Sequence, residues 1–240
     1  MFACKVLLSQ ELAEREKEFL MRVSNPLFPR FERFVEAQDQ WCIVMEYIPG
    51  ITLKELICRQ GSLNEPQAAE MGCQLAQGLL FLHEQTIPII YRDLKPENVM
   101  IEQDGKVRLI DLGCACFVEE KKDTRAGTRG YAAPEQLESG GRVGVESDVY
   151  ALGKLLQFAI GVDDRHKLSG SFFLLLEDMT RPDRRQRVPD MHIFLRRMEQ
   201  FTIKARKKGM KKWVAAALKR RKGRKRFLDF YYKKNVNRGT

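Results

Sequence analysis

The segment from Tyr91 to Asn98 constrains this sequence more than any other, because it places several charged and polar residues in one short loop. The run from Ile87 to Tyr91 before it is β-branched and aromatic, which favours an extended strand. After it, residues 98–102 and 106–110 flank Asp104-Gly105, a dipeptide typical of a hairpin turn. A short loop held between strands can direct its polar side chains into one cleft.

The spacing within this loop suits phosphoryl transfer. Asp93 stands five residues before Asn98. A carboxylate can accept the proton of an attacking hydroxyl, and an amide oxygen can reach a magnesium ion that is bound to phosphates. Such a string can arise by chance when it stands alone, so the interpretation needs support from elsewhere in the chain.

Further motifs follow in order. Asp111-Leu112-Gly113 comes thirteen residues after Asn98, and its carboxylate suits a hard cation. The later ones are Ala133-Pro134-Glu135, then Ser147-Asp148-Val149-Tyr150 at the start of an apolar helix, and Arg181-Pro182-Asp183-Arg184-Arg185. Five ordered matches leave little room for coincidence.

Over about residues 1–200 these motifs resemble the eukaryotic-type (Hanks) serine/threonine protein kinases. The resemblance implies a two-lobed α+β fold with an incomplete β-rich N-lobe over residues 1–48 and a mainly helical C-lobe over residues 49–200. It also implies transfer of the ATP γ-phosphate to Ser or Thr hydroxyls of proteins, with Mg²⁺ as cofactor. In this family an Arg at the position of Arg185 pairs with the Glu of the Ala-Pro-Glu motif, here Glu135.

The resemblance assigns roles to the catalytic loop and its neighbours. Asp93 orients the acceptor hydroxyl and takes its proton, Lys95 stabilises the transferred group, and Asn98 and Asp111 hold magnesium. Thr128 matches the threonine that touches the catalytic Asp. Lys95 and Thr128 together favour serine/threonine over tyrosine substrates.

The first fifty residues match the ATP-binding side of the family. Phe2-Ala3-Cys4-Lys5-Val6 resembles the strand whose Lys grips the α- and β-phosphates, and Glu16 is the expected ion-pair partner of Lys5. Met45 to Tyr47 would form the hinge beside the adenine, with Met45 as gatekeeper and Glu46 and Tyr47 among the cofactor-binding residues.

Regulation is expected at Thr124, within the cationic stretch 121–125. Arg92, which precedes the catalytic Asp, could pair with a phosphate on this threonine. An unmodified loop threonine is the alternative.

Periodicity and turn residues predict the secondary structure. Asn64 can cap the long helix after it, with Gln67 as its capping-box partner. The expected strands cover residues 2–8, 31–37 and 41–47, and the expected helices cover 9–22, 52–59, 64–83, 146–160, 172–179 and 191–201.

The sequence departs from the family in two places. No G-x-G-x-x-G motif precedes Lys5, so the glycine-rich strand pair over ATP is absent. A start upstream, a fragment, and a protein that works poorly or not at all without this lid are three explanations. Under the third explanation, the alternative function is that of a weakly active or inactive pseudokinase or scaffold. About ten residues separate Gly161 from the helix at Phe172, where the family has a substrate-docking helix.

The charge is divided between the body and the tail. Residues 201–240 hold 16 Lys and Arg against one acid, whereas residues 1–200 carry a net charge of −5. We therefore treat 201–240 as a basic extension. Its cluster over residues 204–226 is a solvated extension, a site for anionic membrane surfaces, or a nucleic-acid-binding segment.

The chain lacks the pattern of a secretory signal and has no apolar run long enough to cross a membrane. A cytoplasmic protein is expected, with peripheral membrane attachment through the tail as an alternative. The six cysteines form no C-x-x-C pair, which argues against a zinc site and predicts reduced, mostly buried thiols.

Overall fold

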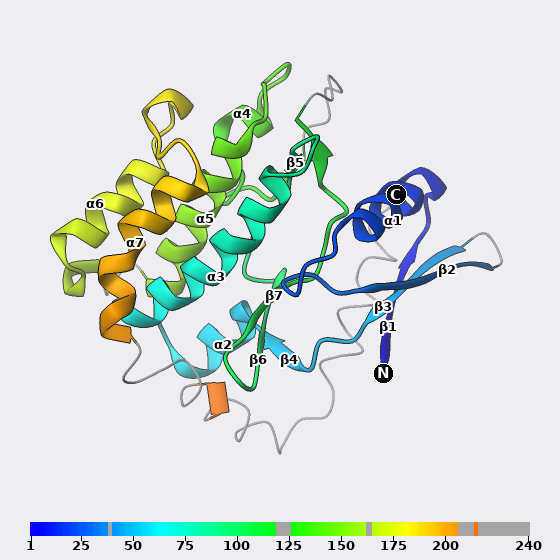
Figure 1. Cartoon of the computed structure of the whole chain (residues 1–240), viewed down its shortest axis with the longest axis horizontal. Helices are drawn as coiled ribbons and strands as arrows, with labels where there is room; N and C mark the ends of the chain where they lie inside the picture. Colours follow the sequence, from blue (N-terminus) through cyan, green and yellow to red (C-terminus); the bar gives the residue numbers. More distant parts are fainter. Residues whose placement is uncertain (38–39, 119–125, 162–164, 206–213, 216–240) are drawn as a thin grey trace.

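A computed structural model describes residues 1–37, 40–118, 126–161, 165–205 and 214–215. It has a smaller part built on a sheet and a larger part built on helices (Figure 1). In this view the strands β1 to β3 and helix α1 lie at one end, and α3, α5, α6 and α7 lie at the other. The predicted α+β class, with few strands in the N-terminal part and helices in the C-terminal part, is confirmed.

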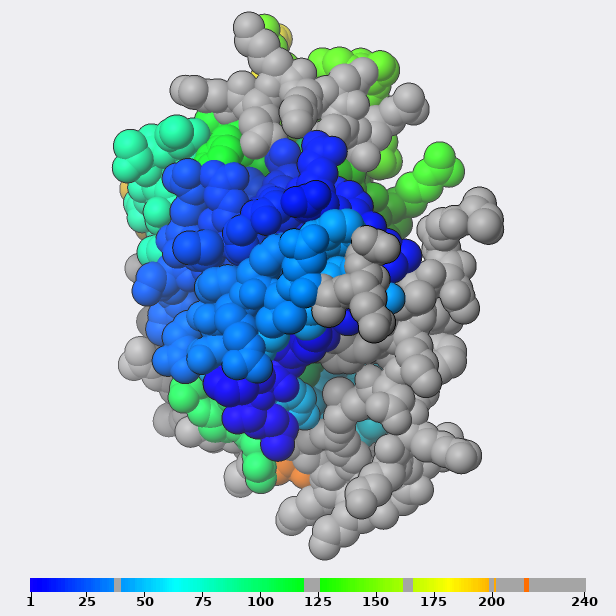
Figure 2. Space-filling view, turned by 90° about the vertical axis from the view of Figure 1, so that its right-hand side faces the viewer, coloured from blue at the N-terminus to red at the C-terminus, as the bar shows by residue number. Residues whose placement is uncertain are grey.

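The N-terminal part is a three-stranded antiparallel sheet with one helix. The strands are β1 (Phe2–Leu7), β2 (Phe31–Ala37) and β3 (Gln40–Glu46), in the order β1-β3-β2. Helix α1 (Gln10–Arg22) begins at Ser9, whose hydroxyl accepts a hydrogen bond from the backbone of Leu12. Figure 2 shows this part from its own side, where the strands and α1 (blue) form one continuous surface. All four elements agree with the predicted ones to within a residue.

Side-chain alternation in β1 decides which residues face the rest of the molecule. Ala3 and Leu7 pack against the core, and Lys5, between them on the same face, lies opposite Ile43 of β3. The strand thus delivers the ammonium of Lys5 to the inner side of the sheet.

The prediction of six reduced, mostly buried thiols is wrong. Cys4 and Cys42 are joined by a disulfide, because adjacent antiparallel strands bring their Cα atoms to 6.0 Å, a normal disulfide distance. Among the free cysteines Cys116 is buried, whereas Cys58 is exposed.

A second small sheet connects the two parts. It contains β4 (Gly50–Thr52), β6 (Val99–Glu102) and β7 (Val107–Leu109) in the order β4-β6-β7, with the predicted hairpin between β6 and β7. Helix α2 (Leu53–Gln60) continues from β4. The short strands β5 (Ile89–Ile90) and β8 (Cys116–Phe117) pair with each other. The sequence did not predict β4 or β8, because three- and two-residue strands are too short to show periodicity.

The C-terminal part is organised around α3 (Glu65–His83), which contacts both α5 (Val145–Ile160) and α7 (Met191–Ala205). The predicted capping box is present: Gln67 N donates to Asn64 Oδ1, and Asn64 N donates to Gln67 Oε1, both at 3.0 Å. The remaining helices are α4 (Pro134–Leu137) and α6 (Gly170–Met179), with 3₁₀ turns at Arg165–Lys167 and Arg184–Gln186.

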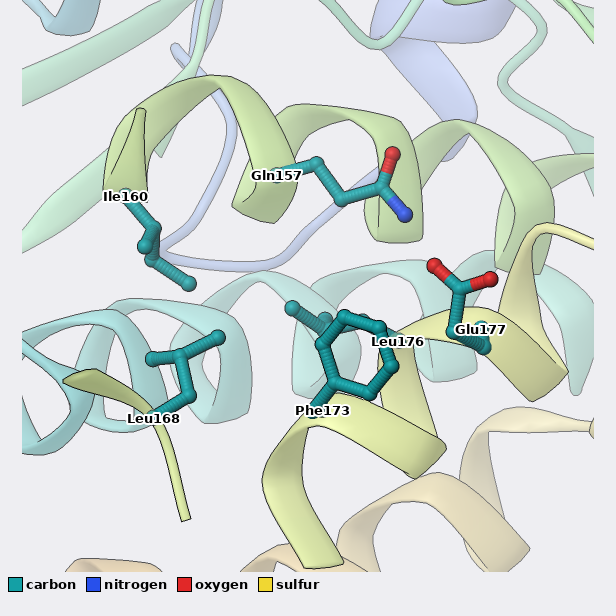
Figure 3. A pocket seen from close by; sticks show the side chains of 6 residues that line it. All are labelled: Gln157, Ile160, Leu168, Phe173, Leu176 and Glu177. Carbon is teal, nitrogen blue, oxygen red and sulfur yellow. The ribbon is translucent and has the colours of Figure 1, made fainter. Parts of the chain in front are cut away.

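Helices α5 and α6 pack directly against each other. Gln157 and Ile160 of α5 face Phe173, Leu176 and Glu177 of α6 (Figure 3). In the described part of the connection between them, residues 161 and 165–169, the only helical element is the three-residue 3₁₀ turn. The short connection expected from the sequence is therefore what lets α6 follow α5 closely.

The predicted partner of Glu135 is wrong by two residues. Arg187, and not Arg185, donates from Nη1 and Nη2 to the Glu135 carboxylate at 2.7 and 2.8 Å. The 3₁₀ turn at Arg184–Gln186 explains the difference, because it turns the chain so that the side chain of Arg187 is fully buried while Arg185 stays exposed. Ser147 Oγ donates to the same carboxylate at 2.7 Å.

Replacing Arg187 by Met should therefore destabilise the fold strongly. The substitution leaves the Glu135 carboxylate without its charged partner in a largely buried place, a loss typically worth about 3–5 kcal/mol. Urea unfolding followed by circular dichroism would measure it. Arg185→Met is the matched control and should change the unfolding free energy by less than about 0.5 kcal/mol. Equal losses for the two variants would contradict the assignment.

Candidate active site

The backbone of the loop 91–98 is held in place by a buried carboxylate on α5. Asp148 is fully buried, and it accepts hydrogen bonds from the backbone N–H groups of Tyr91 at 2.8 Å and Arg92 at 2.9 Å. His83, at the end of α3, lies 2.8 Å from the same carboxylate. These bonds join the loop to two core helices.

Arg92 needs this support because its backbone is in the left-handed region, with φ of 66°. A long side chain adopts that conformation only where its surroundings enforce it. Gln136 of α4 adds to the restraint by donating from Nε2 to the carbonyl of Arg92 at 2.9 Å. No motif in the sequence pointed to Gln136 or His83. The available signal was Asp148, a charged residue on an otherwise apolar helix, which needs buried partners.

Three predicted side chains, two from the loop and Thr128 from a later segment, meet at the Asp93 carboxylate. Thr128 Oγ1 donates to Asp93 Oδ1 at 2.7 Å, and Lys95 Nζ donates to Asp93 Oδ2 at 2.6 Å. Asn98 Nδ2 donates to both the carbonyl and Oδ2 of Asp93, at 2.9 and 3.0 Å. The carboxylate is thus fixed in orientation, and the Asn98 amide nitrogen is committed to it.

A second cluster joins three distant segments through Lys5. Its ammonium donates to both Glu16 oxygens at 2.8 and 2.6 Å and to Asp111 Oδ1 at 2.8 Å. The backbone of Gly113 donates to the same Asp111 oxygen at 2.9 Å. A Cβ on residue 113 would lie only 3.1 to 3.4 Å from Asp111, Glu16 and Lys5, so this close approach favours glycine.

Two carboxylates share one ammonium here, and their pKa values separate. Burial raises the pKa of Glu16 to about 7, the charge of Asp111 adds to the rise, and Lys5 opposes it. Burial also opposes ionisation of Asp111, yet Lys5 holds the pKa of that carboxyl below its usual range. The pKa of Lys5 stands above its usual value because the two carboxylates outweigh the effect of burial.

The two clusters face a common region. Ile110, just before Asp111, donates its backbone N–H to the carbonyl of Asn98 at 3.1 Å. Burial and then the charges of Asp93 and Asp111 together raise the pKa of Cys114 to about 11. The charges of both carboxylates thus raise the pKa of one thiol, that of Cys114. This thiol is protonated at neutral pH and is therefore a poor nucleophile.

The end of β3, the predicted hinge, is fixed by an arginine that the sequence analysis overlooked. Arg108 Nη2 donates to Glu46 Oε2 at 2.7 Å and to the carbonyl of Phe28 at 3.1 Å. The backbone N–H of Glu46 donates to the carbonyl of Arg30 at 2.9 Å, and that of Tyr47 lies 3.4 Å from the carbonyl of Met1. Met45, the predicted gatekeeper, is buried. An Arg inside a short strand gave no sequence signal of such a contact.

The donor set is suited to a magnesium ion bound mainly by phosphates. No group of three or more His, Cys, Asp or Glu residues gathers in a metal-binding arrangement within the described part of the chain. Mg²⁺ bound with nucleotides needs only one or two protein carboxylates or amides. Asp111 Oδ2 and the Asn98 amide oxygen are the groups that remain for it, because Lys5, Gly113 and Asp93 engage the other atoms.

Two predicted features lie outside the described residues. Thr124 falls in the undescribed stretch 119–125, and most of the basic cluster 204–226 falls in 206–213 and 216–240. Arg92, the expected partner of a phosphate on Thr124, is among the described residues. Its Nε donates to the carbonyl of Cys114 at 2.5 Å. Within the described part of the chain, none of the helices combines the length and apolar character that crossing a bilayer requires.

Comparison with known proteins gives consistent matches. The family model of the protein kinase domain matches residues 1–163. Rhodopsin kinase GRK7 from Bos taurus is 36% identical over 165 residues, which cover 64% of this chain and 30% of the relative. Sperm motility kinase 3A from Mus musculus is 35% identical over 147 residues, covering 60% of this chain and 29% of the relative. The chain thus spans less than a third of the length of these relatives.

The raised pKa of Glu16 predicts a pH-dependent stability. A carboxyl with a pKa of 4.5 when unfolded and about 7 when folded binds its proton more tightly in the folded chain. The resulting stabilisation is complete below pH 4.5 and is lost as the pH rises through 7. Relative to Glu16→Gln, the unfolding free energy of the wild type should fall by up to about 3 kcal/mol over this window.

Urea titrations across this pH range would measure the difference. Glu18→Gln, on the exposed side of the same helix, is the control and should follow the wild-type curve. A wild-type curve parallel to that of Glu16→Gln would contradict the assignment.

Proposed function

The chain belongs to the protein kinase family, and we propose that it transfers the γ-phosphate of ATP to serine and threonine hydroxyls of protein substrates. The single observation that carries this proposal is the fixed orientation of Asp93, whose carboxylate is held by Thr128, Lys95 and Asn98. Phosphoryl transfer depends mainly on positioning and electrostatic stabilisation, which such a network can supply.

In this proposal Asp93 orients the acceptor hydroxyl and accepts its proton. Lys95, 2.6 Å from Asp93, provides the positive charge that the transferred phosphoryl group needs. Thr128 bonds to both Lys95 and Asp93 and so ties the segment 126–131 to the reacting centre. This arrangement of Lys95 and Thr128 supports serine and threonine as acceptors.

The nucleotide side of the proposal rests on the Lys5 cluster. Lys5, oriented by Glu16, would bind the phosphates of ATP, and the chain at Glu46 and Tyr47 would lie beside the adenine. Asp111 and Asn98 would hold Mg²⁺, which when bound neutralises charge on the phosphates. Glu16 keeps the ammonium in place through both carboxylate oxygens, so Lys5 does not have to be ordered by the ligand.

The organisation proposed from the sequence is retained: an N-lobe over residues 1–48, a C-lobe over 49–200, a basic extension over 201–240, and a cytoplasmic location. The relatives' names refer to rhodopsin and to sperm motility, and these belong to those proteins.

Thr124 is proposed as a phosphorylation site, with Arg92 as partner of the phosphate. Mass spectrometry of the chain after incubation with Mg²⁺-ATP would detect that phosphate.

Replacing Asp93 by Asn tests the proposed reaction. The variant keeps the shape of the side chain but loses the proton acceptor, so phosphate transfer should fall by at least about 100-fold. Transfer of radiolabelled phosphate from ATP to a serine-containing protein such as casein would measure it. Binding of a fluorescent ATP analogue should stay within about twofold, because the Lys5 cluster is unchanged.

Asp104→Asn, in the turn between β6 and β7, is the matched control and should keep full activity. Nucleotide binding without transfer by the wild type would favour the alternative, a pseudokinase or scaffold. Equal activity of the Asp93 and Asp104 variants would rule out the proposed role of Asp93.

We also propose that the basic cluster 204–226 binds a polyanionic surface. The observation that favours it is the separation of charge, with net −5 over residues 1–200 and 13 Lys and Arg in the cluster. Co-sedimentation with vesicles containing phosphatidylserine and with single-stranded RNA, each at low and high salt, should reveal binding that weakens steeply with salt. Replacing the seven Lys and Arg of 219–226 by Gln should abolish that binding; unchanged co-sedimentation would contradict the proposal.

A further inference from the structure

A lysine on α2 pairs with a glutamate of the catalytic loop. Lys54 Nζ lies 2.6 Å from Glu97 Oε1, and the side chains are 57% and 23% exposed. The hydrogen bond and the charge of Glu97 raise the pKa of Lys54, which is therefore charged at neutral pH. Glu97 comes directly before Asn98 and two residues after Lys95, so this ion pair stands at the edge of the proposed active site.

The position of Lys54 is set by the backbone as well as by its side chain. Its N–H donates to the carbonyl of Pro96 at 3.2 Å, which fixes the first turn of α2 against the loop. Strand β4, which leads into α2, pairs with β6, with Gly50 opposite Glu102 and Thr52 opposite Met100. A Cβ on Gly50 would lie 2.5 Å from the Ile101 carbonyl, so only glycine allows this pairing.

The charge of Glu97 also affects the pKa of a residue in the segment that follows Thr128. Burial and then the charge of Glu97 raise the pKa of Tyr131 to about 12. Since Thr128 bonds to Asp93, the stretch from Thr128 to Tyr131 borders the reacting centre. The Lys54–Glu97 pair therefore lies on the same loop as Asp93 and beside the segment that Thr128 ties to it.

Cations outnumber anions among the charged side chains named along this edge. Lys54 neutralises Glu97, and Arg129, on the adjoining segment, is exposed. An acidic substrate residue could join Lys54 without displacing another group. A basic substrate residue could reach Glu97 only by displacing Lys54 and would be repelled by its ammonium.

We propose that Lys54 is a specificity-determining residue that favours protein segments with an acidic residue close to the acceptor hydroxyl and disfavours basic ones. The proposal rests on the proposed kinase function. Exposed ion pairs contribute about 0.2–1 kcal/mol, so the preference at one position should be up to about fivefold.

Fluorescent serine peptides that carry Glu, Ala or Arg at one flanking position at a time would test the proposal. Their binding to the full chain is measured by fluorescence anisotropy, and their phosphorylation by kcat/KM. The wild type should favour the Glu series over the Arg series in both measurements. Lys54→Ala should remove most of this preference, and Lys54→Glu should reverse it by about threefold or more.

Lys106→Glu is the matched control, because Lys106 is also an exposed lysine in an ion pair, here with Asp104 in the turn between β6 and β7. It changes the net charge by the same amount and should leave the preference unchanged. A wild type that favours the Arg peptides, or a preference that Lys54→Glu leaves intact, would overturn the proposal. Anisotropy measures the peptide preference even if the chain phosphorylates none of the peptides. A lack of phosphorylation alone would contradict the kinase function and not the role of Lys54.

Discussion

The bond between the Asp148 carboxylate and the backbone of Tyr91 and Arg92 supports the rest of the site. A fully buried carboxylate is costly unless hydrogen bonds satisfy it, and here two amides and His83 do so. These bonds hold the loop so that Arg92, directly before Asp93, keeps a left-handed conformation. The rigid helix α5 thus sets the geometry of a loop about sixty residues earlier in the sequence.

The residues of the Lys5 cluster come from both parts of the molecule. Lys5 and Glu16 come from the small sheet and α1, whereas Asp111 comes from the end of the β6–β7 hairpin. Their shared ion pairs hold the two parts together at this point, and Arg108 does the same at the end of β3. Charge attraction in a largely buried place therefore helps to set the relative position of the parts, and with it the proposed nucleotide site.

The substrate side depends on pairs between the loop and the later segments. Glu135 is anchored by Arg187, and Gln136 reaches back to Arg92, so the stretch around α4 is fixed to the catalytic loop. Thr128, in the segment before α4, adds a second link to the catalytic loop by donating to Asp93. The Lys54–Glu97 pair adds charged side chains at the edge of this surface, and because it is exposed we propose that it affects selection of substrates more than stability.

The sequence by itself determined most of the helices and long strands, because local periodicity and caps such as Asn64 and Gly161 specify them. Through a family resemblance it also singled out Lys5, Glu16, Asp93, Lys95, Asn98, Asp111 and Thr128, and the structure brings these residues together in two clusters, while their catalytic roles are a proposal. Only the tertiary structure decided that Arg187 and not Arg185 pairs with Glu135, that Cys4 meets Cys42, and that Arg108 and Lys54 make the contacts described. Such pairings depend on how a turn rotates and on which segments meet in space, and these are properties of the folded chain that residue spacing does not encode.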